Sequence, residues 1–288
     1  MVEFFHDLLN GSPLLLRSAA AMVLAAVACG ISGTYVVLRR ESYAVGAVSH
    51  SLLGGIGIAL FCRAHWNLPW LTPWLGALAA ALMVPFLLTW FTVKLRMRTD
   101  TVLSAIWALG MALGISFITA MPGYQPDLNS YLFGSILMIG PQDLVVIAAL
   151  DALVAVIALA WHQRFVVLAF HQELLGLRGL SVTCTQLAMQ LVVAMTVVIL
   201  SQLVGVVLCI ALLILPVAAA AALCRRIPCI MLLAAILCLG CCMGGIAVSY
   251  ERLPGGILLS PGATIVELAA LCYFIATAIG KLRSRLHQ

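Results

Sequence analysis

The sequence predicts an all-α membrane protein, a polytopic bundle of about nine transmembrane helices. Of its 288 residues, 64% are hydrophobic and only 9% are charged, and the mean hydropathy is +1.17. Soluble domains carry about 25% charged residues. A membrane-spanning helix needs about 20 apolar residues, because ~30 Å of hydrocarbon is crossed at ~1.5 Å per residue. The composition leaves no room for a soluble enzymatic domain, and we expect residues 1–288 to form a single transmembrane domain.

Nine apolar runs follow one another along the chain, separated by charges and by Pro and Gly clusters. The segment before the first run carries Glu3 and Asp7 and lacks the basic start of a secretory signal, so we expect that run to be retained as a span. The sixth and seventh runs are separated only by Ser201-Gln202. The predicted spans are 14–38, 43–61, 70–93, 101–121, 143–161, 182–201, 203–223, 229–249 and 261–280.

The basic residues orient these spans. If the odd-numbered spans run from outside to inside, the outer segments hold only Arg17, Arg63 and Arg252 of the fifteen Lys and Arg. This asymmetry agrees with the positive-inside rule, and merging the sixth and seventh spans would destroy it by placing Arg225 and Arg226 outside. We therefore expect the N-terminus outside and the C-terminus inside. The net charge of +5 reflects this topology, and nucleic acid is not an expected partner.

Two segments between the spans have distinct characters. Pro122 to Pro141 is too short and too polar to cross a membrane, and its apolar middle predicts a short half-helix at the outer face. Segment 162–181 is predicted to be the one long cytoplasmic loop, and it includes Glu173 and Arg178. A long loop on the charged side suggests a docking surface.

Ionisable side chains inside a span are costly to insert, so each is a functional candidate. His50 in the second span is either a metal ligand or gate on a translocation path, or a neutral histidine hydrogen-bonded across the bundle. Asp151 and Glu267 are either pathway residues or neutral acids paired within the bundle. Asp100, at the predicted cytoplasmic mouth of the fourth span, is either a pathway residue or a helix N-cap.

Motifs for covalent or nucleotide chemistry are weak or absent. Residues Gly30 to Gly33 have the Gly-x-Ser-Gly shape of an intramembrane serine protease, but close helix packing explains such glycines better. The ten cysteines lie almost all within apolar runs and are interpreted as small hydrophobes. No Gly-x-x-x-x-Gly-Lys-Ser/Thr motif occurs, so any ATP must be bound by another chain.

Short blocks along the whole chain resemble the membrane subunits of bacterial metal-ion ABC importers, the zinc/manganese/iron permease family. They occur in family order from the first span to the last. The blocks are Gly33–Tyr43, Ser49–Gly54, Asp100–Leu103, Tyr131–Gly134, Pro141–Leu144, Gln202–Gly205, Ala211–Pro216 and Pro261–Val266.

The resemblance implies a permease of the type II ABC importer kind in the bacterial inner membrane, built from two membrane subunits and two cytoplasmic ATPases. An extracytoplasmic binding protein would deliver Zn²⁺, Mn²⁺ or Fe²⁺, and the bundles would import the ion by alternating access. The chain itself would be no enzyme and would bind no covalent cofactor. His50 falls on the intramembrane histidine of the family, and Glu173, Gly176, Arg178 and Gly179 fall on the segment that docks the ATPase.

The chain departs from its relatives at one position of consequence. Four residues before His50, where relatives usually have an aspartate on the same helix face, this chain has Gly46. A carboxylate and an imidazole spaced i, i+4 can hold a divalent ion together, whereas one histidine is a poor site. The second permease subunit is either another copy or, as we favour, a non-identical sister that retains the aspartate.

Two other function classes stay open. A proton-coupled secondary metal transporter would use Asp151 or Glu267 to carry protons, but it predicts an inverted repeat, and the sequence shows no convincing one. An intramembrane serine hydrolase would use Ser32 as nucleophile and His50 as base. The sequence does not select the metal, because one histidine suits zinc, manganese and iron alike.

Overall fold

The computed structural model describes residues 13–121, 140–250 and 260–286, and the regular structure of these residues is entirely helical. The elements are α2 (Pro13–Arg39), α3 (Ser42–Trp66), α4 (Pro73–Thr89), the π-helix η1 (Trp90–Lys94), α5 (Thr99–Thr119), α7 (Pro141–Phe170), α8 (Gln172–Leu177), α9 (Val182–Leu203), α10 (Val206–Leu223), α11 (Ile227–Tyr250) and α12 (Pro261–Leu286).

Each predicted span corresponds to a long helix within the described residues. Eight of these helices are long and apolar enough to cross a membrane, and the remaining apolar helix, α10, has 18 residues. The chain breaks between α9 and α10 at Gly205, whose φ of 91° lies in the region that favours glycine. The division of residues 182–223 into two helices is therefore confirmed. The half-helix predicted between Pro122 and Pro141 falls almost wholly outside the described residues.

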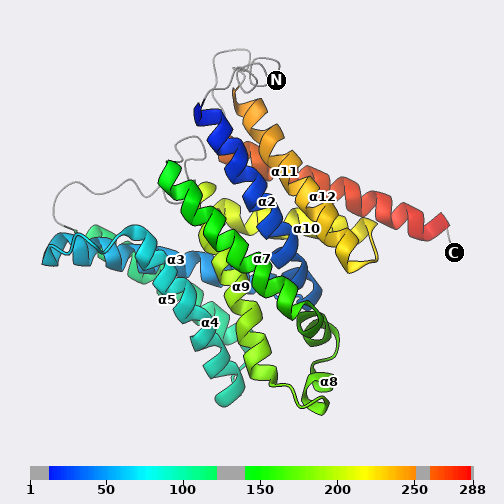
Figure 1. The fold of residues 1–288 in the computed structure, drawn as a ribbon, viewed down its shortest axis with the longest axis horizontal. Coiled ribbons are helices and arrows are strands. Elements are labelled where there is room, and N and C mark those ends of the chain that lie inside the picture. Colours follow the sequence, from blue (N-terminus) through cyan, green and yellow to red (C-terminus); the bar gives the residue numbers. More distant parts are fainter. Residues whose placement is uncertain (1–12, 122–139, 251–259, 287–288) are drawn as a thin grey trace.

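The helices form two groups that meet at α9 (Figure 1). In the first group α3 packs against both α4 and α5, and α4 packs against α9. In the second group α10, α11 and α12 pack against one another, and α2 contacts both α11 and α7. Because α9 contacts helices of both groups, it is the centre of the bundle.

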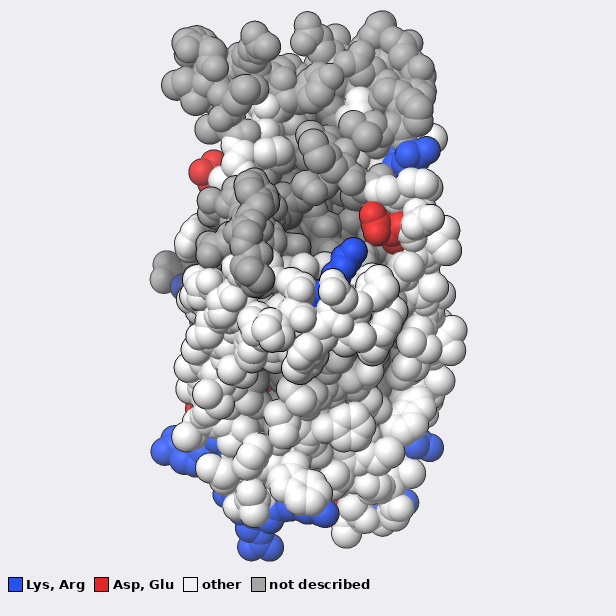
Figure 2. All heavy atoms as spheres, turned by 90° about the vertical axis from the view of Figure 1, so that its left-hand side faces the viewer, with Lys and Arg blue, Asp and Glu red and all other residues white. Residues whose placement is uncertain are grey.

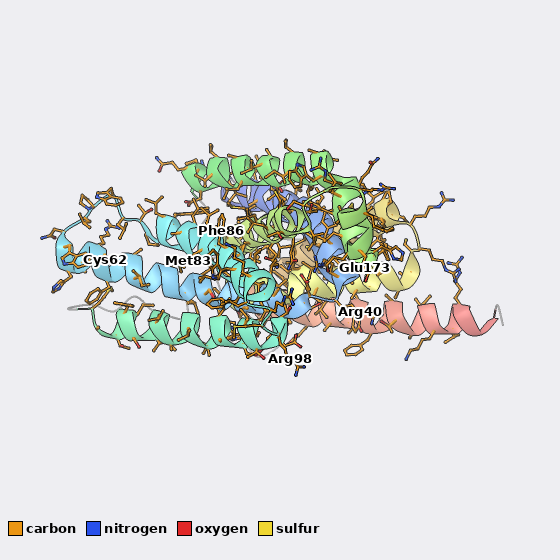
Figure 3. The ribbon with its side chains drawn as sticks, turned by 90° about the horizontal axis from the view of Figure 1, so that it is seen from below. Arg40, Cys62, Met83, Phe86, Arg98 and Glu173 are labelled. Atoms are coloured by element: carbon orange, nitrogen blue, oxygen red, sulfur yellow. The ribbon has the colours of Figure 1, made fainter. Side chains whose placement is uncertain are left out.

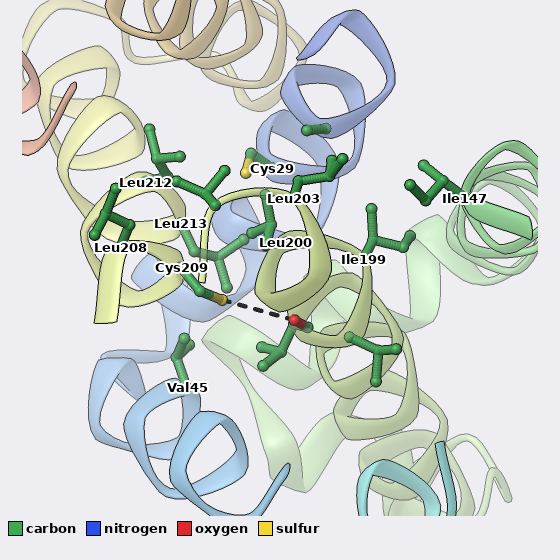
Figure 4. Close-up of a cluster of buried hydrophobic side chains, with 14 of the residues drawn as sticks. Cys29, Val45, Ile147, Ile199, Leu200, Leu203, Leu208, Cys209, Leu212 and Leu213 are labelled. Atoms are coloured by element: carbon green, nitrogen blue, oxygen red, sulfur yellow. Dashed lines mark hydrogen bonds between the residues drawn. The ribbon is translucent and has the colours of Figure 1, made fainter. Parts of the chain in front are cut away.

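The largest buried core surrounds the C-terminal half of α9 (Figure 4). Leu200 of α9 and Leu213 of α10 are fully buried there. The thiol of Cys209 points to the carbonyl oxygen of Val197 at 3.9 Å, so this cysteine bridges α10 and α9. The other members shown include Cys29, Val45, Ile147, Ile199, Leu203, Leu208 and Leu212.

Charged side chains lie toward the two ends of the bundle. Figure 2 shows Lys and Arg at the lower end of one face and charged side chains of both signs toward the upper end, with a broad band nearly free of charge between them. Figure 3 views the bundle from below and labels Arg40, Arg98 and Glu173. Arg40 lies between α2 and α3, Arg98 directly precedes α5, and Glu173 lies in α8. A charge-free band bounded by a basic end is the pattern expected of a protein that spans a membrane.

The segment 162–181 is more regular than the predicted loop. Helix α7 continues through Phe170 and the short helix α8 follows directly, so the prediction of a long loop is wrong. The reason is that Phe165 and Leu168 are buried against the core, which extends the apolar face of α7 beyond the predicted span. With 30 residues, or about 45 Å at 1.5 Å per residue, α7 exceeds the ~30 Å of a hydrocarbon core.

Candidate functional site

Helices α3 and α5 run in the same direction in close contact along a seam of glycines. A Cβ added at Gly54 would lie 2.8 Å from the carbonyl oxygen of Gly110, and one added at Gly57 would lie 2.8 Å from that of Gly114. Backbones approach this closely only where no side chain intervenes. The seam therefore fixes which residues of the two helices face each other.

His50 lies on this contact and is half-buried. Its imidazole stacks on the indole of Trp107 in α5, with ring centroids 4.7 Å apart and 19° between the planes. The Nδ1 atom of His50 is buried and has no hydrogen-bond partner in the described part of the chain. A buried nitrogen without a partner is unfavourable, and coordination of a metal ion would satisfy it. The alternative of a histidine hydrogen-bonded across the bundle through this atom is not supported.

Trp107 also fills the space beside Gly46. A Cβ added at Gly46 would overlap the ring atom Cζ3 of Trp107 and lie 2.7 Å from Cη2. Tyr43, one turn earlier, contacts the same indole at 5.2 Å between centroids, and its hydroxyl lies 3.2 Å from Oγ of Ser104. An aspartate at position 46 would collide with the indole. Sequence reasoning missed Trp107, because nothing in the sequence shows which residue of α5 faces Gly46.

Asp100 lies at the start of the same helix pair. The N-cap of α5 is Arg98, and Asp100 lies within the first turn, so the interpretation of Asp100 as the N-cap residue is wrong. Its side chain is exposed, and its backbone carbonyl accepts a hydrogen bond from Oγ of Ser104 at 2.8 Å. Asp100 is therefore one turn from Ser104, which also contacts Tyr43 of α3.

The remaining acids lie on other helices. Asp151 of α7 is 5% exposed, and its Oδ1 atom has no hydrogen-bond partner in the described residues. Glu267 of α12 is exposed. Within residues 13–121, 140–250 and 260–286, no group of three or more His, Cys, Asp or Glu side chains is arranged to hold a metal ion. Within the described residues, the structure thus does not combine His50 with these acids into a multidentate site.

The residues of the serine hydrolase alternative are engaged in packing. The hydroxyl of Ser32 donates to the carbonyl oxygen of Ala28 at 2.6 Å, and no hydrogen bond joins it to His50 in the described residues. A Cβ at Gly30 would lie 2.6 Å from the carbonyl oxygen of Met231, and one at Gly33 would lie 2.5 Å from that of Leu213. These glycines allow α2 to approach α11 and α10, which is the helix-packing role expected of them.

Helix α8 presents the residues predicted to dock a partner. Gly179 has a φ of 69°, and the bonds from its N–H to Gly176 and from Leu180 N–H to Leu175 close a Schellman motif at the end of α8. Leu175 is buried and anchors the helix. The exposed residues of α8 and its two ends are His171, Gln172, Glu173, Leu174, Gly176, Leu177, Arg178 and Gly179. Leu177, which sequence reasoning did not single out, is 83% exposed.

Comparisons with known proteins agree with this architecture. A family model described as "ABC 3 transport family" matches residues 12–280. The chain belongs to this family. It is 35% identical to an uncharacterised membrane protein of Synechocystis over 91% of this chain and 89% of that protein. It is also 36% identical to a "Probable metal transport system membrane protein" of Chlamydia trachomatis, over 83% of this chain and 81% of the relative.

A solved structure shares the fold. "PsaBC from Streptococcus pneumoniae in complex with Fab" superposes with a TM-score of 0.82 and 21% identity, covering 98% of this chain and all of that chain. The all-helical permease fold is thereby confirmed. Membership of the ABC 3 transport family, together with relatives named as transport system membrane proteins, also confirms that the chain is a membrane permease subunit rather than an enzyme.

Proposed function

We propose that this chain is the transmembrane subunit of an ATP-driven importer for a divalent metal ion, Zn²⁺, Mn²⁺ or Fe²⁺, and forms half of its path by alternating access. The observation that carries the proposal is the half-buried imidazole of His50, whose buried Nδ1 has no partner in the described residues. Imidazole is a common protein ligand for such ions. The name of the Chlamydia relative, a metal transport membrane protein, supports the same cargo.

The arrangement around His50 is suited to passage rather than storage. An ion in transit must be bound weakly enough to leave, and one imidazole binds more weakly than a complete ligand set. Trp107 holds the ring in one orientation by stacking and occupies the place where a second ligand on α3 would lie. Further ligands would therefore come from the second permease subunit, either another copy or a sister chain that retains the aspartate.

Three acids are proposed along the path. Asp100 is the best placed, because it begins the helix that carries Trp107, seven residues or about 10 Å away along α5. Asp151 is buried with an unpartnered oxygen, which suits a transient contact with the ion. Glu267 is exposed on an apolar helix, and since a carboxylate facing lipid is costly, it would face the second subunit.

We propose that α8 docks a cytoplasmic ATPase through Glu173, Gly176, Arg178 and Gly179, with Leu177 as an apolar contact. Helix α8 follows α7 directly, so a displacement of α8 on ATP binding would be passed to α7 and then to α9, against which α7 packs. The rest of the assembly follows the family: two ATPases, a second permease subunit and an extracytoplasmic metal-binding protein. The site of action would be the bacterial inner membrane, with the N-terminus outside and the C-terminus inside.

The test is uptake of radiolabelled Zn²⁺ and Mn²⁺ by cells that carry the full system, with ATP hydrolysis followed in the reconstituted complex. Replacing His50 with alanine should abolish most uptake and leave assembly intact. His65 is the matched control, because it is an exposed histidine at the other end of α3 that stacks on Phe61. Unchanged uptake by the His50→Ala complex would remove His50 from the path.

Two further experiments address the alternatives. Purification with the products of neighbouring genes should yield two kinds of membrane subunit, and recovery of one kind alone would contradict the sister-chain hypothesis. The isolated chain in liposomes should not move metal ions in response to a proton gradient. Proton-driven transport without an ATPase would instead support a secondary transporter.

A further inference from the structure

Cys224 and Cys229 form a pair of accessible thiols at the turn between α10 and α11. Cys224 directly follows the last residue of α10, and Cys229 lies in the first turn of α11. Their sulfur atoms are 2.7 Å apart. Cys229 is exposed and Cys224 is partly exposed, whereas Cys29, Cys209, Cys238 and Cys242 are buried in the core. The packing role that suits the buried cysteines does not explain this pair.

The two sulfur atoms are already placed for bond formation. A disulfide joins sulfurs at about 2.05 Å, so closing this pair requires a movement of less than about 1 Å. Only Arg225 and Arg226 separate Cys224 from the start of α11, and Cys229 lies in the first turn of that helix. Thiols that close this readily exchange with small disulfides through a mixed-disulfide intermediate.

The surroundings of the pair are strongly basic. Cys224, Cys229 and the arginines Arg225, Arg226 and Arg283 line one hollow of about 940 Å³. Within this lining all the charged side chains are cationic. A concave surface with one sign of charge concentrates small ions of the opposite sign and speeds their association. The hollow therefore favours an anionic reagent over a neutral or cationic one.

The two thiols differ in exposure, and this difference assigns them different roles. The hydrogen bond with Cys229 raises the pKa of Cys224, while the nearby Arg283 acts in the opposite direction. Cys229 is also the more exposed of the two. It is therefore the attacking sulfur, and Cys224 is the resolving one.

We propose that Cys224 and Cys229 form a thiol–disulfide exchange site for an anionic low-molecular-weight disulfide of the glutathione type. The thiolate of Cys229 attacks one sulfur of the reagent, forming a mixed disulfide and releasing one thiolate. Cys224 then loses its proton and attacks Cys229, and the second thiolate leaves. In total two protein thiols become one disulfide, and the reagent, reduced by two electrons, takes up their two hydrogens as two thiols.

The experiment uses the full chain purified in detergent, so it does not depend on the transport proposal. Reduced protein is treated with glutathione disulfide, which is anionic, with hydroxyethyl disulfide, which is neutral, or with cystamine, which is cationic. We expect a mass loss of about 2 Da mapped to Cys224 and Cys229, because two hydrogens leave. At low salt glutathione disulfide should react about tenfold faster than cystamine, and high salt should reduce this ratio.

Matched variants separate the steps. In Cys224→Ser the glutathione adduct should remain trapped on Cys229, while Arg225→Ala with Arg226→Ala should remove the preference for the anionic reagent. Cys184, an exposed cysteine at the start of α9, is the control within the chain and should form only slow adducts with all three reagents.

Three outcomes would overturn the proposal. The first is a pair that stays fully alkylatable after oxidation, and the second is an equal rate with all three reagents. The third is protection of the reduced pair by Zn²⁺ together with failure to form the internal bond, which would mark a metal-binding pair instead.

Discussion

Helix α9 and the α3–α5 seam hold their neighbours in opposite ways. Helix α9 is buried along most of its length by large side chains, among them Ile199 and Leu200, that interlock with both groups of helices. The seam instead depends on missing side chains, since Gly54, Gly110 and Gly114 bring two backbones together. Hydrocarbon tails are as apolar as leucine, so in a membrane close packing rather than burial from water drives association in both regions.

This difference in packing suggests that α9 mainly stabilises the fold, whereas the α3–α5 seam carries the residue proposed for function. The side chains of α9 fill the space between its neighbours, and the helix carries no Asp, Glu, Lys, Arg or His. Along the seam the helices are thin, most of α5 is exposed, and the half-buried His50 lies at the edge of the contact. The site proposed for a passing ion therefore lies where fewer side chains fill the space between helices, and the following predictions test this difference between the two regions.

The largest effect on stability is expected at α9. Leu200→Ala removes a fully buried side chain and should lower the free energy of unfolding by about 2–4 kcal/mol, because a cavity remains. Thermal unfolding in detergent measures the change. Leu177→Ala, at a side chain that is 83% exposed, is the control and should leave the midpoint in place. Equal effects of the two substitutions would show that α9 is not the centre of stability.

A smaller effect is expected when volume is added to the seam. Gly54→Ala places a Cβ 2.8 Å from the carbonyl oxygen of Gly110 and should destabilise the protein by about 1–3 kcal/mol. Gly240→Ala in α11 is the matched control, because a Cβ there meets no atom within 4 Å. That substitution should be neutral or stabilise by up to about 1 kcal/mol, since alanine suits helices better than glycine. If Gly54→Ala and Gly240→Ala changed the free energy of unfolding in the same direction, the close backbone contact between α3 and α5 would be contradicted.

The close contact between Gly46 and Trp107 predicts that substitutions at the two positions have coupled effects on the free energy of unfolding. Gly46→Ala should destabilise the protein in the presence of Trp107 and should be tolerated after Trp107→Ala, because the overlapping ring is then absent. A double-mutant cycle of unfolding free energies should give a coupling free energy of about 1 kcal/mol or more. Additive effects would mean that the indole does not occupy this space.

The same pair predicts a change in metal binding. Gly46→Asp combined with Trp107→Ala places a carboxylate one turn before His50 and should tighten Zn²⁺ or Mn²⁺ binding at least tenfold, because two ligands replace one. Isothermal titration of the purified chain measures the affinity. His50→Ala in this background is the control and should reverse the gain.

No effect on stability is expected at α8, where the predicted change is in assembly. Leu177→Asp should reduce co-purification of the ATPase subunit, since it places a charge in an apolar contact, while the unfolding midpoint stays constant. Leu95→Asp is the comparison, because this leucine is exposed between η1 and α5, outside both α8 and the candidate spans, and the substitution should leave recovery of the ATPase unchanged. Normal recovery of the ATPase with Leu177→Asp would move the docking surface elsewhere.

Sequence reasoning located the helices well because the spans are long and charges fall between them. It divided residues 182–223 correctly into two spans. The positive-inside rule requires two spans there, because a single span would place Arg225 and Arg226 outside. It failed at 162–181, where the buried Phe165 and Leu168 continue α7, because tertiary burial and not hydropathy decides where that helix ends. It also misassigned the N-cap of α5, since which residue begins a helix depends on backbone geometry.

The amino-acid sequence by itself determined the membrane fold, the order of its helices, the family and the absence of a nucleotide-binding motif. These properties follow from composition, hydrophobic run length and short local blocks, all of which depend on residues that are neighbours in the sequence. Only the tertiary structure decided that Trp107 faces Gly46 and His50, and that Cys224 meets Cys229 in a basic hollow. Such pairings depend on the register and separation of helices, which packing of the whole bundle sets.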